Sequence, residues 1–463
     1  MGKYTGHTIT SDSALGDAKI QRSLRFNDDD SAYLNRTPSS AGDRRTWTWS
    51  GWVKRAQSST NQNLFSVREG SNTRTIIRIS DGLDFLDDDI NFRLKTNAKF
   101  RDFSAWYHFV VVSNTTDSTS SNRLKVYVNG EQITSFSTET YPSQNYEGQI
   151  NTTNEHALGR EGGTDNDYLD GYMAEVNFVD GYAYDPSYFG FTDPVTGSWM
   201  PRRYEGTYGT NGFYLDFSDN SSTAALGIDK SPNGNDWSVN NFSVSAGAGN
   251  DSLEDTPTNN FPTLNPLNIN PYSVSGYPSP TFTNGNLTFT TNTTSQVNYA
   301  ESSMYFPESG KWYLEVNVNN LNIGSGVGYA QITLRGDTGG SRYLWWVYSS
   351  PYYEINTNSG TQTIGSISNG DIIQVAYDAN TGNLWFGKNN SWYLSGDPSS
   401  LTPMSPATTV VNDYTKFYVA GRSGSGQNVM DVNFGQRPFN YTPPTGFKAL
   451  CSKNLPPNAP SII

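Results

Sequence analysis

The stretch Leu124-Lys125-Val126-Tyr127-Val128-Asn129-Gly130-Glu131-Gln132-Ile133 decides the fold class of this chain. Apolar and polar residues alternate along its first half, and a period of two residues is typical of a strand that buries one face. Asn-Gly is the pair that a type I′ turn favours, because both central positions of that turn take a positive φ. The stretch therefore predicts a β-hairpin that turns at Asn129-Gly130.

Similar strand-like runs recur at intervals of roughly ten residues, separated by Gly, Asn, Ser, Asp or Pro. The clearest are residues 47–53, 106–112, 171–178, 310–318 and 371–377. Short strands at this spacing, with few helix-forming segments between them, are typical of β-sandwiches and jelly rolls. We therefore predict an all-β fold.

The 463 residues exceed one typical core of about 150 residues. We predict two tandem antiparallel β-sandwich (jelly-roll) domains joined by a loop-rich linker, because a stretch rich in Gly, Asn, Ser and Pro separates two strand-rich blocks. The expected segments are an N-terminal arm at 1–20, a first sandwich at 21–200, an extension and linker at 201–270, a second sandwich at 271–452 and a Pro-rich tail at 453–463.

Composition argues against several classes of partner. The net charge is −13 and no basic block occurs, so neither nucleic acid nor an anionic membrane surface is an expected partner. No apolar run reaches about 18 residues, which argues against membrane insertion. Cys451 is the single cysteine, so no intrachain disulfide can form. The first residues have no apolar segment of the signal-peptide type, and we expect synthesis in a cytosol.

Four segments of the first block occur in the order found in laminin-G-like, concanavalin A-type jelly rolls, and this block resembles that family. They are residues 47–54, 106–111, 124–130 and 170–176. The second block resembles a SPRY domain. That likeness is carried by residues 310–316, 326–329, 370–373, 384–389 and 431–439.

The combination resembles tandem virion proteins of tailed phages, especially phages of aquatic bacteria, with further likeness in residues 33–38 and 446–451. The resemblance implies a structural virion component, such as a tail fibre, spike or capsid decoration, that is made in the host cytoplasm and displays its sandwiches for host adhesion. It also implies that the arm at 1–20 attaches to other virion proteins and that the chain forms a homo-oligomer. A free carbohydrate-binding module protein and a virion-borne glycan depolymerase are the alternatives.

No pattern of catalytic residues stands out, and we predict that the chain is not an enzyme. Retaining glycoside hydrolysis uses two carboxyl groups about 5 Å apart. Neither Glu175 nor Glu315 has an acidic partner two residues away, on the same face of its strand. His7, His108 and His156 have no partners in a nucleophilic or zinc motif, and no Gly-x-Ser-x-Gly segment occurs.

Aromatic residues near the middle of the second block are the predicted ligand site, because the C–H faces of sugars pack on aromatic rings. The residues are Trp345, Trp346, Tyr348, Tyr352 and Tyr353. Alternation along a strand sends Trp345 and Trp346 to opposite faces. Packing of one ring in the core and the other against a neighbouring subunit is the alternative, and the commoner use of such side chains.

No cofactor is expected, apart from calcium. Laminin-G-like modules often bind calcium through loop carboxylates and carbonyls, and hard oxygen ligands are what this ion prefers. The candidate ligands are Asp87, Asp88, Asp89, Asp229, Asn233, Asn235 and Asp236. None of these clusters matches a complete loop signature, and solvated turns are the commoner use of such residues.

Overall fold

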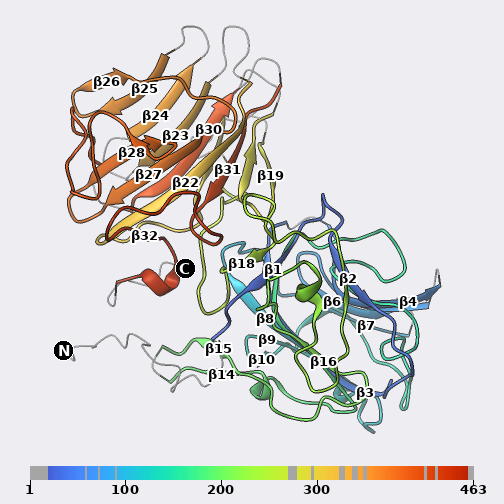
Figure 1. Ribbon diagram of the computed structural model, residues 1–463. Helices are drawn as coiled ribbons and strands as arrows, with labels where there is room; N and C mark the ends of the chain where they lie inside the picture. Colours follow the sequence, from blue (N-terminus) through green and yellow to red (C-terminus); the bar gives the residue numbers. More distant parts are fainter. Residues whose placement is uncertain are drawn as a thin grey trace. The chain divides into compact units, whose positions relative to one another are not determined.

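The computed structural model describes residues 19–57, 60–70, 73–88, 91–194, 196–269, 279–292, 297–322, 329–335, 342–347, 352–410, 414–422 and 426–456. Over these residues the chain consists of β-strands with four short 3₁₀ turns, which confirms the all-β prediction (Figure 1). They form two compact units, one ending at Asn259 and the other beginning at Asn260. No helix in the described part of the chain is long and apolar enough to cross a membrane.

The first unit is a sandwich of two antiparallel sheets, named here after β13 and β5. In order, the β13 sheet contains β10 (Glu131–Gln132), β9 (Leu124–Val128), β8 (Trp106–Asn114), β3 (Thr46–Arg55), β13 (Gly171–Asp180), β1 (Ser23–Phe26) and β18 (Ser252–Leu253), and β16 (Phe213–Leu215) also pairs with β13. The β5 sheet contains β11 (Phe136–Thr140), β7 (Phe92–Thr96), β6 (Leu83–Asp87), β5 (Thr73–Ile79), β4 (Gln62–Gly70), β12 (His156–Leu158), β2 (Tyr33–Arg36) and β17 (Ser238–Asn240). The remaining elements are the pair β14 (Gly190–Thr192) and β15 (Trp199–Pro201) and the turns η1 (Ser120–Asn122), η2 (Pro186–Tyr188) and η3 (Ala224–Gly227).

The predicted hairpin is present. β9 pairs antiparallel with β10, and the turn residues Asn129 and Gly130 have φ angles of 49° and 85°. Both values lie in the left-handed region that the type I′ turn requires.

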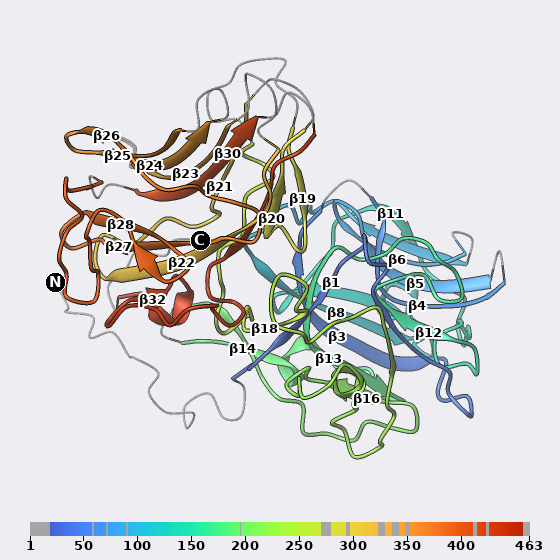
Figure 2. The same cartoon turned by 45° about the horizontal axis from the view of Figure 1, so that its top comes forward.

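The β13 sheet is buried on both faces. Successive side chains of β8 lie on opposite faces of the sheet. Phe109 and Val111 enter the main core between the sheets, whereas Val110 and Val112 belong to a second apolar cluster. That cluster includes Tyr204, Tyr208 and Tyr214, which come from the segment after β13. In Figure 2 the green segment around β16 lies on the side of β13 away from β4, β5 and β6. The continuous apolar run in β8 is explained by this second layer.

Residues up to Asn259 belong to the first unit, so its boundary lies well beyond the expected position at residue 200. Two buried ion pairs hold the end of this segment: Arg25–Asp251 at 2.9 Å and Lys54–Asp255 at 2.7 Å. β16, β17 and β18 add to the two sheets. The low apolar content of this segment favoured a linker, but polar and ionic contacts fix it in place.

The second unit is also a sandwich of two sheets, named after β22 and β23. The β22 sheet contains β19 (Thr281–Thr283), β20 (Thr288–Thr290), β31 (Val429–Asn433), β22 (Lys311–Asn320), β27 (Ile372–Asp378), β28 (Asn383–Lys388) and β29 (Ser391–Trp392), with β32 (Lys448–Ala449) parallel to β22. The β23 sheet contains β21 (Asn298–Glu301), β30 (Lys416–Arg422), β23 (Tyr329–Arg335), β24 (Arg342–Val347), β25 (Tyr352–Thr357) and β26 (Gly360–Thr363). The turn η4 (Ser452–Asn454) follows β32.

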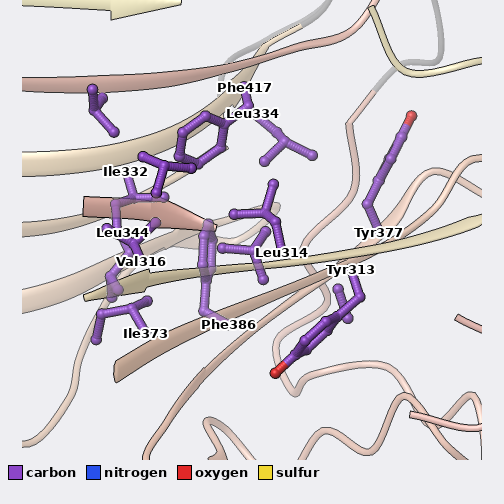
Figure 3. Close-up of a cluster of buried hydrophobic side chains, with 14 of the residues drawn as sticks. Tyr313, Leu314, Val316, Ile332, Leu334, Leu344, Ile373, Tyr377, Phe386 and Phe417 are labelled. Atoms are coloured by element: carbon purple, nitrogen blue, oxygen red, sulfur yellow. The ribbon is translucent and has the colours of Figure 1, made fainter. Parts of the chain in front are cut away.

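Figure 3 shows the centre of this second core, where side chains of the two sheets meet. Fully buried side chains of the β22 sheet face those of the β23 sheet; they include Leu314, Val316, Ile373 and Phe386 from the first and Ile332, Leu334, Leu344 and Phe417 from the second. Burial of this apolar area drives the association of the two sheets.

Candidate functional site

Two short strands share one edge of β13 and leave a gap between them. β1 pairs with Gly171–Met173, and β16 pairs with Val176–Phe178. β3 occupies the other edge, where its register shifts between Ala174 and Asn177. Glu175 lies at this bulge, opposite the gap.

The backbone of Glu175 is strained. Its φ of 52° lies in the left-handed region, which side chains other than glycine rarely adopt and which costs on the order of 1–3 kcal/mol. Strain of this kind, and bulges in general, cluster next to functional sites. The strained backbone and the bulge make Glu175 a candidate site residue. The residues next to it in the sequence do not reveal these features.

The carboxyl group of Glu175 is held by one hydrogen bond, in which the Tyr214 hydroxyl donates to Oε2 at 2.7 Å. Burial raises the pKa of Glu175 to about 7. The negative charge of Asp216 raises this pKa further, whereas the Tyr214 hydrogen bond and the Arg203 charge lower it. Near neutral pH, Glu175 is therefore present in both protonation states.

A cavity of about 310 Å³ opens at the gap and is called the Glu175 cavity. It is lined by Lys19, Gln21, Glu175, Arg203, Tyr214, Asp216 and Ser218. The chain before β1 supplies Lys19 and Gln21, and the chain after β16 supplies Asp216 and Ser218. The cavity exists because both strands end at this point, and its lining is almost entirely polar.

A second hollow of about 310 Å³ adjoins the first and shares Arg203 and Tyr214 with it. It is called the Tyr208 hollow and is lined by Arg203, Tyr204, Glu205, Gly206, Tyr208, Tyr214, Lys230 and Pro232. The Tyr208 hydroxyl donates to Oδ1 of Asn177 on β13 at 2.8 Å. Burial raises the pKa of Tyr208, so this hydroxyl stays protonated.

Three tyrosines, called the tyrosine stack, extend this surface: Tyr182, Tyr184 and Tyr188. Ring centroids lie 5.4 Å apart for Tyr182 and Tyr184, and 4.0 Å apart for Tyr184 and Tyr188. Tyr182 is 40% exposed and Tyr188 is 44% exposed. The ring centroid of Tyr204, which lines the Tyr208 hollow, lies 5.9 Å from that of Tyr184. The stack, the hollow and the cavity are thus neighbours on the outer side of the β13 sheet.

Sequence reasoning missed this surface. Its residues are spread from Lys19 to Lys230, and strand pairing rather than spacing brings them together. One local signal was available: Tyr182 and Tyr184 stand two residues apart, directly after β13, as residues on one face of an extended chain do.

The aromatic residues predicted to bind a ligand lie on neighbouring strands. Trp346 of β24 stands opposite Tyr353 of β25, and Trp345 stands opposite Glu354. The side chains of Trp345, Trp346, Tyr352 and Tyr353, and the whole of Tyr348, lie outside the described residues. Their binding role stays a prediction.

The candidate calcium ligands are engaged in other hydrogen bonds. Asp87 accepts from the Tyr146 hydroxyl at 2.7 Å and from Nδ2 of Asn91 at 2.9 Å. Oδ1 of Asp88 accepts from the Arg74 amide at 3.0 Å. Asp89 lies outside the described residues. Within the described ranges, no group of three or more His, Cys, Asp or Glu side chains is arranged to hold a metal ion.

The candidates at 229–236 lie in a loop that is held by hydrogen bonds to its own backbone and to the backbone of residues 212–214. Asp229 accepts from the amides of Tyr214 and Asn235, and Asp236 accepts from the Asp229 amide. Asn233 and Asn235 donate to the Gly212 carbonyl. Calcium binding stays a prediction for both clusters.

Glu315 is a structural acceptor in the second sandwich. It is buried and accepts from the Tyr313 hydroxyl at 2.8 Å, from the Asn440 amide at 2.8 Å and from the Tyr441 amide at 2.9 Å. Its carboxylate ties the loop after β31 to β22.

Comparison with known families identifies the fold of the first sandwich. Residues 27–184 match the sequence model of the concanavalin A-like lectin/glucanases superfamily. The first sandwich has a concanavalin A-like jelly-roll fold. The match ends at Tyr184, so most of the second layer, which covers the outer face of the concanavalin A-like sandwich, lies beyond it. The comparison with curated proteins gave no match.

Among solved structures, the chain is similar to a Bacteroides ovatus protein described as carbohydrate-binding, with 15% identity and a TM-score of 0.32 over 48% of this chain. The chain spans 58% of the length of that protein. It is also similar to the SPRY domain of human HERC1 (15% identity, TM-score 0.27, 39% of this chain, 99% of that one) and to mouse laminin α1 domains LG4-5 (9%, 0.30, 91% and 94%).

Proposed function

We propose that this chain is a non-enzymatic adhesion component of a bacteriophage virion, and that it binds a host-surface glycan on the outer face of its concanavalin A-like sandwich. The observation that carries the proposal is the exposed tyrosine stack beside the Tyr208 hollow and the Glu175 cavity. Contiguous exposed apolar patches often mark ligand-binding or interaction sites.

The chemistry of this surface suits a carbohydrate. Rings such as those of Tyr182 and Tyr188 can pack against the C–H faces of sugars, and their hydroxyl groups stay in water. Polar groups in the Tyr208 hollow and the Glu175 cavity can bond sugar hydroxyls. A few placed polar groups beside an apolar face are typical of ligand sites.

The virion part of the proposal is supported by the sequence resemblance to tailed-phage proteins. In this arrangement residues 1–20 attach the chain to other virion proteins, the chain self-associates, and the sandwiches are displayed to the host. Mass spectrometry of purified particles tests it. Recovery of the chain with the particles supports the proposal, whereas a chain found only free in the medium favours the alternative of a free carbohydrate-binding module protein.

Binding of the purified full chain to host cells, and to polysaccharide extracted from them, tests the adhesion site. We expect Tyr182→Ala and Tyr188→Ala each to weaken binding about tenfold, which corresponds to roughly 1.4 kcal/mol of lost contact. Tyr414→Ala is the matched control, because Tyr414 is a tyrosine of the second unit that is 63% exposed. Unchanged binding by both stack variants overturns the site.

A glycan depolymerase is the second candidate, and one observation favours it. Glu175 of β13 and Asp216, the residue after β16, line the same cavity. Glycoside hydrolysis pairs a carboxyl group of raised pKa with a second carboxylate. Release of reducing ends from the bound polysaccharide, abolished by Glu175→Gln, would replace adhesion with hydrolysis; we expect no release.

A further inference from the structure

We propose that the Glu175 cavity is the subsite that receives a carboxylate group of the glycan, and that the protein takes up a proton when this group binds. The inference rests on the proposed function and names the class of sugar, a uronic or other acidic sugar. It follows from the charges that line the cavity and from the place of Glu175 among them.

The charged groups that line the cavity make its suitability for an anion depend on the protonation of Glu175. Lys19 and Arg203 are cations, and Glu175 and Asp216 are carboxyl groups. Protonation of Glu175 removes one of the two negative charges in this lining, which makes the cavity more favourable for an anion.

The charged and titratable groups around Glu175 come from three segments. Tyr214 and Asp216 belong to β16 and the residue after it, Arg203 and Tyr208 belong to the segment before β16, and Lys19 precedes β1. Burial raises the pKa of Glu175 to about 7 in spite of the Arg203 charge and the Tyr214 hydrogen bond. A second anion beside Glu175 disfavours its ionised form still more.

The hydrogen bond from Tyr214 indicates which carboxyl oxygen of Glu175 carries the proton. The Tyr214 hydroxyl donates to Oε2, so in the neutral acid the proton is on Oε1. A carboxylic acid that donates to a carboxylate forms one of the stronger hydrogen bonds in proteins. The protonated Glu175 thus binds an anion, whereas the ionised Glu175 repels it.

The direction in which affinity for an acidic sugar changes with pH follows from the linkage between ligand binding and proton binding. The pKa of Glu175 is higher in the complex than in the free protein, so the complex holds more protons over the interval between the two pKa values. Affinity for an acidic sugar therefore rises as the pH falls towards 7, by at most about tenfold per pH unit, and then levels off.

Glucuronate is the probe, and its uncharged methyl ester is the matched control ligand. The measurement is carbon-13 NMR of the glutamate carboxyl signals of the full chain as a function of pH, with Glu175→Gln used to assign the Glu175 signal. We expect saturating glucuronate to raise the pKa of Glu175 by about one unit, and the ester to leave it unchanged. A pKa that glucuronate does not move overturns the proposal.

Two variants separate this subsite from a general binding effect. Glu175→Gln resembles the protonated acid, so we expect it to bind glucuronate with an affinity that no longer depends on pH near 7. Arg203→Gln should weaken glucuronate binding and spare the ester. If Glu175→Gln keeps the pH dependence of the wild type, the proton is taken up elsewhere and the proposal fails.

The outcomes for the subsite and for the adhesion site are distinguishable. If the tyrosine stack variants abolish glycan binding and glucuronate leaves Glu175 unaffected, the adhesion site stands and the acidic subsite is wrong. If glucuronate shifts the pKa of Glu175 and the stack variants bind the host glycan normally, the subsite stands without the tyrosine stack.

Discussion

The indole Nε1 of Trp199 donates a hydrogen bond of 3.0 Å to Nδ1 of His108. An indole N–H can only donate, so Nδ1 is the acceptor and the proton of the neutral ring is on Nε2, which donates to Oγ of Ser50 at 2.8 Å. The imidazole is buried and stacks on Trp52, with ring centroids 4.8 Å apart. One histidine thus joins β8, β3 and β15 and fastens the second layer to the β13 sheet.

We predict that His108 stays neutral well below the ordinary pKa of histidine, because burial lowers its pKa to about 3. The unfolded chain takes up a proton near pH 6.5 and the folded chain does not, so the contribution of His108 to stability falls as the pH drops below about 6.5. Nitrogen-15 NMR of the imidazole groups should show the Nε2–H tautomer at pH 5. A protonated His108 in the folded protein at that pH would contradict the burial argument.

His156 provides an internal comparison. Its Nε2 accepts from the Asn151 amide at 3.0 Å, so its proton is on Nδ1, which lies 2.9 Å from the Asn154 carbonyl oxygen. The same spectrum should therefore contain one ring of each tautomer, and a His7→Gln variant removes the third histidine signal.

The buried Lys54–Asp255 pair predicts a large loss of stability when one partner is removed. Both side chains are almost fully buried, and Asp255 also accepts from Nε1 of Trp106 at 3.0 Å. Asp255→Ala leaves a buried ammonium group without its counter-ion, and we expect it to cost about 3–5 kcal/mol in chemical denaturation. Lys54→Met combined with Asp255→Asn should recover much of that loss, because no buried charge remains and Trp106 keeps an acceptor.

An exposed pair serves as the control for this prediction. Arg101 and Asp81 form an ion pair whose side chains are 56% and 34% exposed. Pairs in water contribute little, so Asp81→Asn should leave the unfolding curve almost unchanged. Equal losses for Asp255→Ala and Asp81→Asn would show that burial is not the deciding factor.

We predict that substitution of Gly130 by alanine also lowers stability, for two physical reasons. Its φ is 85°, and a Cβ at this position would lie 2.5 Å from the Trp199 ring. Gly234 has a φ of 67° and no heavy atom within 4 Å of such a Cβ. Gly234→Ala should therefore cost about 1 kcal/mol through backbone strain alone. Gly130→Ala should cost about 1–3 kcal/mol more, because the ring of Trp199 must move.

The same substitutions can be followed at His108. Displacement of the Trp199 ring breaks its hydrogen bond to Nδ1, so Gly130→Ala should change the imidazole nitrogen shifts of His108 and Gly234→Ala should not. Equal unfolding energies for the two variants, with unchanged His108 signals, would mean that the ring has room to accommodate the methyl group.

We expect Glu315→Gln to lower stability, whereas Glu175→Gln should change the pH dependence of ligand binding. Gln at position 315 places an amide group against donors from Asn440 and Tyr441, and we expect Glu315→Gln to cost about 1–3 kcal/mol. Hydrogen exchange should locate that loss in the second sandwich, with glycan binding intact. Reduced glycan binding by a stable Glu315→Gln protein would assign a functional role to this carboxylate.

The sequence revealed local features better than distant ones. The Asn129-Gly130 turn is encoded by adjacent residues, and residues 106–112 were recognised as a strand from their own apolar side chains. The segment around Asp251 and Asp255 contains few apolar side chains, and its place in the first sandwich depends on cations more than 200 residues earlier. Glu175 was assessed from the residues of its own strand, whereas its acidic neighbour Asp216 directly follows β16. Spacing within one strand cannot reveal such a pair.

The pairing of β1 with β18 has a consequence for how the protein is made. Arg25 meets Asp251 across 226 residues, beyond the midpoint of the 463-residue chain. A nascent chain cannot close its first sandwich until this part has left the ribosome, and contacts of such long range are slow to form. Until then the apolar cluster of Trp52, Trp106 and Tyr172 lacks Leu253. Fragments that stop near residue 200 should consequently aggregate during synthesis, and expression of this sandwich calls for a chain that continues to Asn259.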